Sequence, residues 1–117
     1  GSEQLEQLAG RFDVLWFDAQ FDAAHGPFMD TAAVLVSLDL VITSDSAVAH
    51  LAGALGVPVW LLLPRSADWR WLHAGETSPW YPTLRLYRQQ QLGQWADVFA
   101  QVANDLQILT RQSRRQA

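Results

Sequence analysis

The sequence predicts an α/β protein with a Rossmann-like, three-layer α/β/α architecture and a parallel sheet of about four strands. Its 117 residues are 50% hydrophobic and 17% charged, an ordinary globular composition that excludes a disordered chain. Short apolar runs of strand length alternate with helical stretches that are bounded by capping residues. These runs are nearly continuous, which is typical of strands that helices cover on both faces of a parallel sheet.

The first third of the chain predicts two helices with a strand between them. Gly1 and Ser2 resemble residues left by cloning and are set aside. Residues 3–9 form a short amphipathic helical stretch, and residues 14–17 form an apolar run that predicts a buried strand. Asp30 then caps a predicted helix over residues 31–37, whose small and apolar side chains suit close packing.

The middle of the chain predicts a strand, a helix and another strand. Residues 38–43 predict the first of these strands. Residues 44–46 form a turn with helix-capping chemistry, and residues 47–55 predict a helix that Gly56 ends. Residues 59–63 predict the next strand, which follows a proline at a position where a strand tolerates a missing N–H group.

The last third predicts a fourth strand and a long helix. Residues 84–88 alternate in the manner of a strand, and residues 94–111 predict the clearest helix of the chain. The apolar stripe of this helix comprises Trp95, Val98, Phe99, Val102, Ala103, Leu106 and Leu109. Residues 113–117 predict a frayed polar tail, so residues 3–112 form the one domain that this length allows.

Composition excludes several classes of function. The chain has no cysteine, which excludes disulfides, thiolate metal sites and a cysteine nucleophile, and its net charge of −4 argues against nucleic-acid binding. The longest apolar run, residues 57–63, falls far short of the roughly 20 residues that a membrane span needs. With no visible signal peptide, the expected location is the cytoplasm. The three histidines lack ligand-like spacing, so no metal is expected. The chain has no GxGxxG or GxxxxGK[ST] motif, so no nicotinamide or other cofactor is expected either.

The strongest candidate site is the junction at residues 43–50, where a predicted strand leads directly into a helix. The first-turn N–H groups of a helix lack internal partners and carry roughly half a positive charge, which favours phosphate. Ala47 and Val48 present such amides, Ser46 offers a cap and a hydroxyl contact, and His50 lies about one turn into the helix.

Ser46 and His50 can also be explained by structural roles alone, without a ligand. Every α/β protein needs Ser or Asp at its helix N-termini, so Ser46 is equally well explained as an ordinary cap. His50 is likewise compatible with a half-buried histidine whose hydrogen bonds are satisfied within the fold. Residue spacing leaves both interpretations open.

A second candidate cluster follows the third predicted strand, in a long loop rich in aromatic residues. It contains Trp69, Arg70 and Trp71 together with Trp80 and Tyr81. Large aromatic side chains in such a loop either pack down as a core or lid, or stack on a ligand. A guanidinium in this position offers a planar grip on phosphate or carboxylate.

Residues 38–60 resemble the donor-site motif of family 9 glycosyltransferases, the heptosyltransferase-like GT-B enzymes. The residues that carry the resemblance read LDLVITSDSAVAHLAGALGVPVW. Residues 63–89 are similar to the C-terminal region of bacterial tetratricopeptide-repeat proteins that contain such a transferase-like domain. The resemblance covers roughly residues 14–110.

The resemblance implies the C-terminal, donor-binding half of a GT-B enzyme. The residues that would bind the donor diphosphate are Asp45, Ser46, Ala47, Val48 and His50. Asp45 and Ser46 would begin the helix, the amides of Ser46, Ala47 and Val48 would face the diphosphate of a nucleotide sugar, and His50 would approach that diphosphate or the sugar. Ala47 stands where heptosyltransferases commonly have glycine, so a particular sugar such as ADP-heptose is not implied.

The resemblance also implies roles for the aromatic loop and for a second domain of the enzyme. Trp69, Arg70 and Trp80 are the candidate contacts to the base or sugar. The general base is expected in an N-terminal acceptor domain outside this chain, so the chain alone is expected not to transfer sugar. Two alternatives remain: a GT-B-like nucleotide-sugar epimerase, and a non-catalytic transferase-like scaffold beside tetratricopeptide repeats.

Overall fold

A computed structural model describes residues 13–15, 17–66, 75–77 and 81–116, and the chain divides into two compact units, residues 1–31 and 32–117. The elements, in chain order, are α2 (Met29–Val36), β1 (Val41–Ser44), α3 (Ala47–Ala54), β2 (Val59–Leu63), β3 (Leu84–Arg88) and α4 (Ala96–Gln116). Strands alternate with helices from β1 to β2. The predicted α/β class is therefore confirmed.

The sheet of the second unit contains three described strands in the order β1-β2-β3, all of them parallel. Val41 of β1 lies opposite Val59 of β2, and Leu63 at the end of β2 lies opposite Arg88 of β3. Because the strands run in the same direction, their carboxyl ends share one edge of the sheet. Ligands of open parallel sheets bind beyond that edge.

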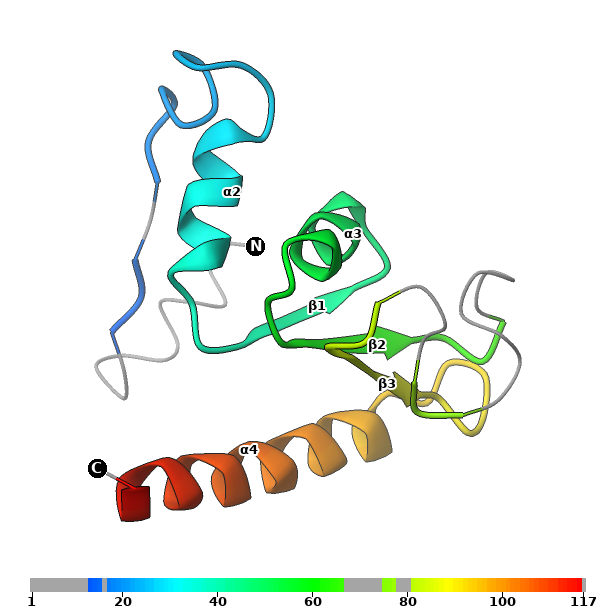
Figure 1. The fold of residues 1–117 in the computed structure, drawn as a ribbon. Helices are drawn as coiled ribbons and strands as arrows, with labels where there is room; N and C mark the ends of the chain where they lie inside the picture. The colour runs from blue at the N-terminus through cyan, green and yellow to red at the C-terminus, as the bar shows by residue number, and fades with distance from the viewer. Residues whose placement is uncertain (1–12, 16, 67–74, 78–80, 117) are drawn as a thin grey trace. The chain divides into compact units, whose positions relative to one another are not determined.

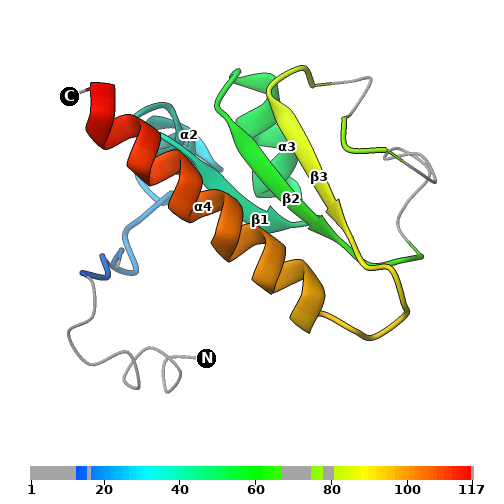
Figure 2. The same cartoon turned by 90° about the horizontal axis from the view of Figure 1, so that it is seen from below.

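Two helices cover opposite faces of the sheet, which makes the three layers that the sequence predicts (Figures 1 and 2). All five residues of β2 are buried. Val59, Leu61 and Leu63 pack on the α3 side, where the helix presents Ala49 and Ala52. The alternate residues of β2 face α4 in a second core cluster, formed by Trp60, Leu62, Tyr87, Val98 and Val102.

A polar contact joins β3 to α4 within this second cluster. The hydroxyl of buried Tyr87 donates to Asp105 Oδ2 at 2.8 Å, and the same oxygen lies 3.2 Å from Nη2 of Arg85. The Arg85 guanidinium lies 4.8 Å from the centre of the Tyr87 ring. Burial raises the pKa of Tyr87 well above its ordinary value, and the hydrogen bond to the Asp105 carboxylate raises it further.

In the first unit, Asp22 organises the turn before α2. Its backbone has a φ of +62°, and its N–H donates to the Asp30 carboxylate at 2.8 Å. The Asp22 carboxylate accepts hydrogen bonds from the hydroxyl and the N–H of Thr31, and these bonds lower the pKa of Asp22. The sequence predicts Asp30 as the cap of a helix that begins at Thr31, but α2 begins two residues earlier, at Met29, so Asp30 lies in its first turn.

The predicted strand at residues 14–17 is wrong for the part of it that the structure describes. Residues 13–15 and 17 have no strand conformation, and Leu15 is 80% exposed. A strand needs a hydrogen-bonding neighbour, and the described sheet pairs only β1, β2 and β3. The count of about four strands is therefore one too high for the described residues. The helix predicted at residues 3–9 lies outside them.

Several other boundaries differ from the predictions. The strand predicted at residues 38–43 is observed as Val41–Ser44. It begins later because the chain forms a turn after α2, in which the N–H groups of Ser37 and Leu38 donate hydrogen bonds to the carbonyls of Val34 and Leu35. Helix α4 begins two residues later than predicted and continues to Gln116, so residues 112–116 belong to it and not to a tail. Four of the seven residues in its predicted stripe, Trp95, Val98, Val102 and Leu106, belong to the second core cluster or pack against it, whereas Phe99 is 57% exposed.

The raised pKa of Tyr87 predicts a loss of stability in alkali. Above about pH 10, the ordinary pKa of tyrosine, unfolded Tyr87 releases its proton while the folded protein retains it. The unfolding free energy should therefore be unaffected by this group below that pH and fall above it, by up to about 1.4 kcal/mol per pH unit.

Urea denaturation of wild type and Tyr87→Phe between about pH 8 and 11 measures this effect. The chain contains no lysine or cysteine and only two tyrosines, so few other side chains titrate in this range. Tyr87→Phe should flatten the dependence. An equal slope in the variant would show that Tyr87 is not its source.

Candidate functional site

The junction between β1 and α3 forms the centre of the candidate site. β1 ends at Ser44, Ser46 is the N-cap residue with an extended backbone (φ −155°, ψ 171°), and α3 begins at Ala47. The N–H groups of Ala47 and Val48 belong to the first turn, where a helix offers them no internal acceptor. The structure therefore places both amides at the carboxyl edge of the sheet, as the sequence predicts.

Ser46 occupies the cap position without forming the predicted side-chain cap. Its hydroxyl makes no hydrogen bond to the helix and lies 3.4 Å from Oγ1 of Thr43. The Thr43 hydroxyl in turn donates to the carbonyl of Ser44 at 3.2 Å. The Ser46 side chain therefore leaves the first turn of α3 without a side-chain cap, open to another acceptor.

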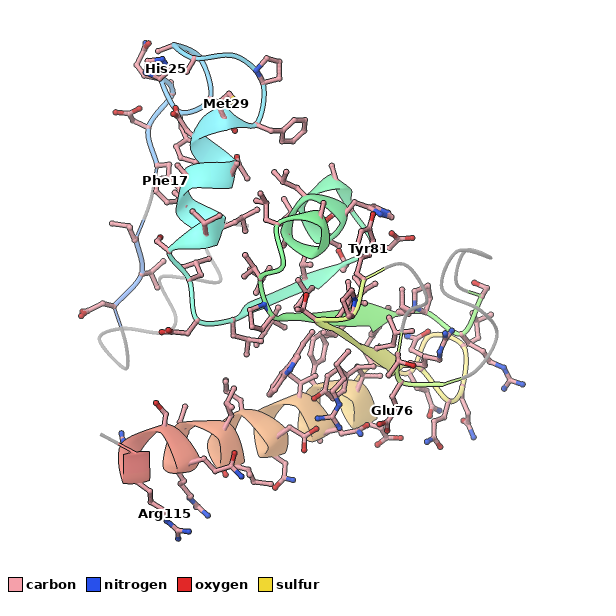
Figure 3. The ribbon with its side chains drawn as sticks, viewed as in Figure 1. Phe17, His25, Met29, Glu76, Tyr81 and Arg115 are labelled. Carbon is pink, nitrogen blue, oxygen red and sulfur yellow. The ribbon has the colours of Figure 1, made fainter. Side chains whose placement is uncertain are left out.

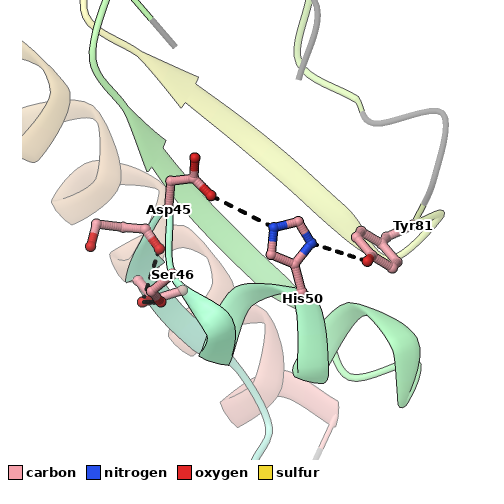
Figure 4. A network of polar contacts seen from close by, with 6 residues as sticks. Asp45, Ser46, His50 and Tyr81 are labelled. Atoms are coloured by element: carbon pink, nitrogen blue, oxygen red, sulfur yellow. Dashed lines mark hydrogen bonds and ion pairs between the residues drawn. The ribbon is translucent and has the colours of Figure 1, made fainter. Parts of the chain in front are cut away.

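His50 lies one turn into α3, between an aromatic and an acidic side chain (Figure 4). Its Nδ1 is 3.1 Å from the hydroxyl oxygen of Tyr81, and its Nε2 is 3.8 Å from Oδ1 of Asp45. The two rings meet edge to face, with centroids 5.8 Å apart. About a third of the His50 and Asp45 side chains is exposed. The contact at Nδ1 directs Nε2 toward the N-terminal end of the helix.

Gly53 makes room for the ring that orients His50. It is buried in the middle of α3, and a Cβ atom at this position would lie 2.6 Å from Cγ of Tyr81. Such a distance is far inside van der Waals contact. The glycine therefore lets the Tyr81 ring pack directly on the helix backbone, with its hydroxyl at His50. Figure 3 shows Tyr81 beside α3.

Sequence reasoning did not find the contact between Tyr81 and His50. The sequence places Tyr81 in the aromatic cluster and Gly53 within residues 38–60, and neither pattern predicts that the two residues meet. A glycine in a helix that is otherwise rich in alanine is a signal for close approach, because it costs helix stability. The other members of the second cluster, Trp69, Arg70, Trp71 and Trp80, lie outside the described residues, so their predicted contacts stay predictions.

Helix α3 ends as its sequence predicts. Gly56 has a φ of +74°, and its N–H donates to the carbonyl of Gly53 while that of Val57 donates to Ala52. This pair of bonds is a Schellman motif, in which the left-handed residue is usually glycine. The motif fixes the exit of α3 toward β2, so both ends of the helix are anchored to the sheet.

An apolar cavity borders the same junction on the other face of the sheet. Its volume is about 380 Å³, and it is lined by Ile42, Thr43, Ser44, Leu62, Trp95 and Phe99. Thr43 links it to the Ser46 hydroxyl. The carboxyl edge thus combines hydrogen-bond donors at α3 with a neighbouring apolar surface that includes two aromatic rings.

In the part of the chain that the structure describes, no three His, Cys, Asp or Glu side chains gather as metal ligands would. None of the described helices is both long enough and apolar enough to cross a lipid bilayer.

Comparison with known proteins finds one informative similarity. The chain is 38% identical over 78 residues to protein FlbA of Caulobacter vibrioides. The match covers 66% of this chain but only 13% of FlbA, so the chain corresponds to a small part of that bacterial protein. No protein-family model matches the chain. No solved structure matches it either.

Because Tyr81 packs on Gly53, replacing this glycine by alanine should change the stability of the protein in the direction opposite to the usual one. Gly→Ala inside a helix ordinarily stabilises it by about 1 kcal/mol. Gly53→Ala should instead destabilise the protein by about 1–3 kcal/mol, because the new methyl group overlaps the ring. Urea denaturation of the variant measures the change.

A double-mutant cycle with Tyr81→Ala separates the ring from other causes. Once the ring is removed, Gly53→Ala should become neutral or stabilising. An unchanged destabilisation in the Tyr81→Ala background would show that the ring is not what excludes a side chain at position 53.

Proposed function

We propose that this domain binds the diphosphate of a nucleotide sugar at the N-terminal end of α3, as the donor-binding part of a bacterial GT-B glycosyltransferase of the family 9 type. The supporting observation is that Ser46 holds the cap position without capping, which leaves the first turn open at the carboxyl edge of the sheet. The resemblance of residues 38–60 to the donor motif of that family supports the choice of ligand.

The electrostatics of the junction suit a diphosphate. The N–H groups of Ala47 and Val48 and the positive end of the helix dipole attract negative charge, and the Ser46 hydroxyl adds a donor. When the Tyr81 hydroxyl donates to Nδ1, neutral His50 carries its proton on Nε2 and can donate it to a phosphate oxygen.

Asp45 has a supporting role in this arrangement. An ionised carboxylate only accepts hydrogen bonds, so the Asp45 side chain does not contact a phosphate oxygen directly. Its Oδ1, 3.8 Å from His50 Nε2, instead keeps the imidazole turned toward the ligand. This role differs from the direct diphosphate contact that the resemblance implies.

The same groups would assist transfer of the sugar. Negative charge grows on the nucleoside diphosphate as it leaves, and donors fixed in advance stabilise that charge without rearrangement. A general base that activates the acceptor belongs to another domain in this proposal. The apolar cavity beside Ser44, with Trp95 and Phe99 in its wall, offers a stacking surface for the base of the nucleotide.

An amide NMR titration with ADP, UDP, GDP and their sugar conjugates tests the proposal. Chemical shifts should change at residues 46–50 and at the indole N–H of Trp95, and the strongest binder names the base. His50→Ala should weaken binding about ten-fold, because a hydrogen bond to a charged group contributes about 1.5 kcal/mol. Ser46→Ala should weaken it less.

Matched variants serve as controls. His25→Ala removes an exposed histidine of the first unit, and Ser37→Ala removes an exposed hydroxyl that donates to the carbonyl of Val34. Both should bind like wild type. Chemical-shift changes confined to residues outside 46–50 would contradict the proposal. No response to any nucleotide at saturation would also contradict it, and would favour a transferase-like scaffold that does not bind nucleotides.

A further inference from the structure

Asp45 places a negative charge beside the open first turn of α3. It directly precedes the N-cap residue Ser46, and its Oδ1 lies 3.8 Å from Nε2 of His50, one turn into the helix. Figure 4 shows the carboxylate pointing toward the His50 ring. About a third of the Asp45 side chain is exposed, so it borders the place where the proposed diphosphate binds.

Helix stability explains this carboxylate only in part, because the same charge opposes an anion. Aspartate at a helix N-terminus interacts favourably with the helix dipole. A phosphate bound at that end meets the same dipole and is repelled by the carboxylate. The described ion pair of Asp45 is with His50, a side chain that is charged only when protonated. When His50 is neutral, as in the proposed site, this pair does not cancel the negative charge of Asp45.

The nitrogen between them limits the distance from Asp45 to a bound phosphate. A phosphate oxygen that accepts from Nε2 of His50 lies about 2.9 Å from that nitrogen. Because Oδ1 of Asp45 lies 3.8 Å from the same atom, the two oxygens are at most about 7 Å apart. Charges are screened over about 10 Å at 0.1 M salt, so the repulsion acts across this separation. The donors at Ala47, Val48 and His50 contact the phosphates directly, so the site attracts anions overall.

The size of the repulsion depends on the charge of the diphosphate. Both phosphate groups of a nucleotide sugar are diesters, and each carries a single negative charge. A free nucleoside diphosphate ends in a monoester, whose second proton dissociates at about pH 6. At about pH 8 it therefore carries roughly one negative charge more than the nucleotide sugar. A fixed carboxylate beside the site weakens the binding of the free diphosphate more than that of the nucleotide sugar.

We propose that Asp45 makes this site select diphosphate diesters, such as nucleotide sugars, over free nucleoside diphosphates. The inference rests on the proposed function, because it concerns the same first turn of α3. The amides of Ala47 and Val48 and Nε2 of His50 bind either ligand, and Asp45 sets the difference between the two affinities. Sugar transfer turns the diester into a monoester, so this selection favours release of the product.

Two ligands that differ by one charge test the inference. They are a nucleoside diphosphate and its β-methyl ester, prepared with adenosine, uridine and guanosine. Calorimetric titration of the full chain at about pH 8 and low salt gives both dissociation constants. The ratio of the constant for the diphosphate to that for the ester should fall about three-fold in Asp45→Asn, the factor for one unit charge across about 7 Å of water. Any effect of the substitution that weakens both ligands equally cancels in this ratio.

Two further variants and a change of salt serve as checks. Asp45→Ser also removes the charge and should lower the ratio by a similar factor. Asp39→Asn removes an exposed carboxylate that precedes β1 and should leave the ratio unchanged. At about 1 M salt, where charges are screened beyond about 3 Å, the difference between wild type and Asp45→Asn should disappear.

The inference and the proposed function fail in different ways. An unchanged ratio in both Asp45 variants, with amide shifts still at residues 46–50, would overturn the inference and leave the proposed function in place. Weaker binding of the nucleotide sugar alone by Asp45→Asn, with the diphosphate and the methyl ester unaffected, would also overturn it, because Asp45 would then contact the sugar. Absence of binding by all of these ligands would contradict both.

Discussion

The complete burial of β2 is the constraint on which the rest of the second unit depends. This strand pairs on both sides with parallel neighbours and is covered on both faces, by α3 through Val59, Leu61 and Leu63 and by α4 through Trp60 and Leu62. Every backbone N–H and C=O of such a strand must be paired by the ladders, because water cannot reach it. The parallel register that satisfies this demand also brings the carboxyl ends of all three strands to one edge. The junction at α3 and the apolar cavity beside it lie at that edge for this reason.

At that edge, the packing of neighbouring side chains determines the direction in which the polar groups point. The absence of a side chain at Gly53 admits the Tyr81 ring, the Tyr81 hydroxyl holds Nδ1 of His50, and Nε2 is thereby turned toward the open first turn of α3. A backbone feature in the middle of a helix thus sets the direction of a side chain one turn earlier. The Ser46 hydroxyl lies beside Thr43 and makes no cap hydrogen bond, so it leaves the same first turn open.

The sequence is informative where local signals and burial agree. The strand at residues 59–63 and the helix before it are predicted well, because continuous apolar residues follow Gly56 and a proline that mark the turn between them. An apolar run alone is ambiguous: residues 14–17 are predicted as a strand, but the described residues of that run, 14, 15 and 17, have no strand conformation. Residues 112–116 are polar and have no helix-stop signal, and Arg114 and Arg115 favour the negative end of the α4 dipole. The contact between His50 and Tyr81 joins positions 31 residues apart, and no periodicity or cap rule encodes it.

A crystal structure of the chain with a bound nucleoside diphosphate would test the central claim most directly, namely that the open first turn of α3 is an anion site. We expect the phosphates within hydrogen-bond distance of the N–H groups of Ala47 and Val48 and of Nε2 of His50, with the Tyr81 hydroxyl still at Nδ1. A diphosphate bound elsewhere on the chain, or a His50 ring turned away from it, would contradict the claim.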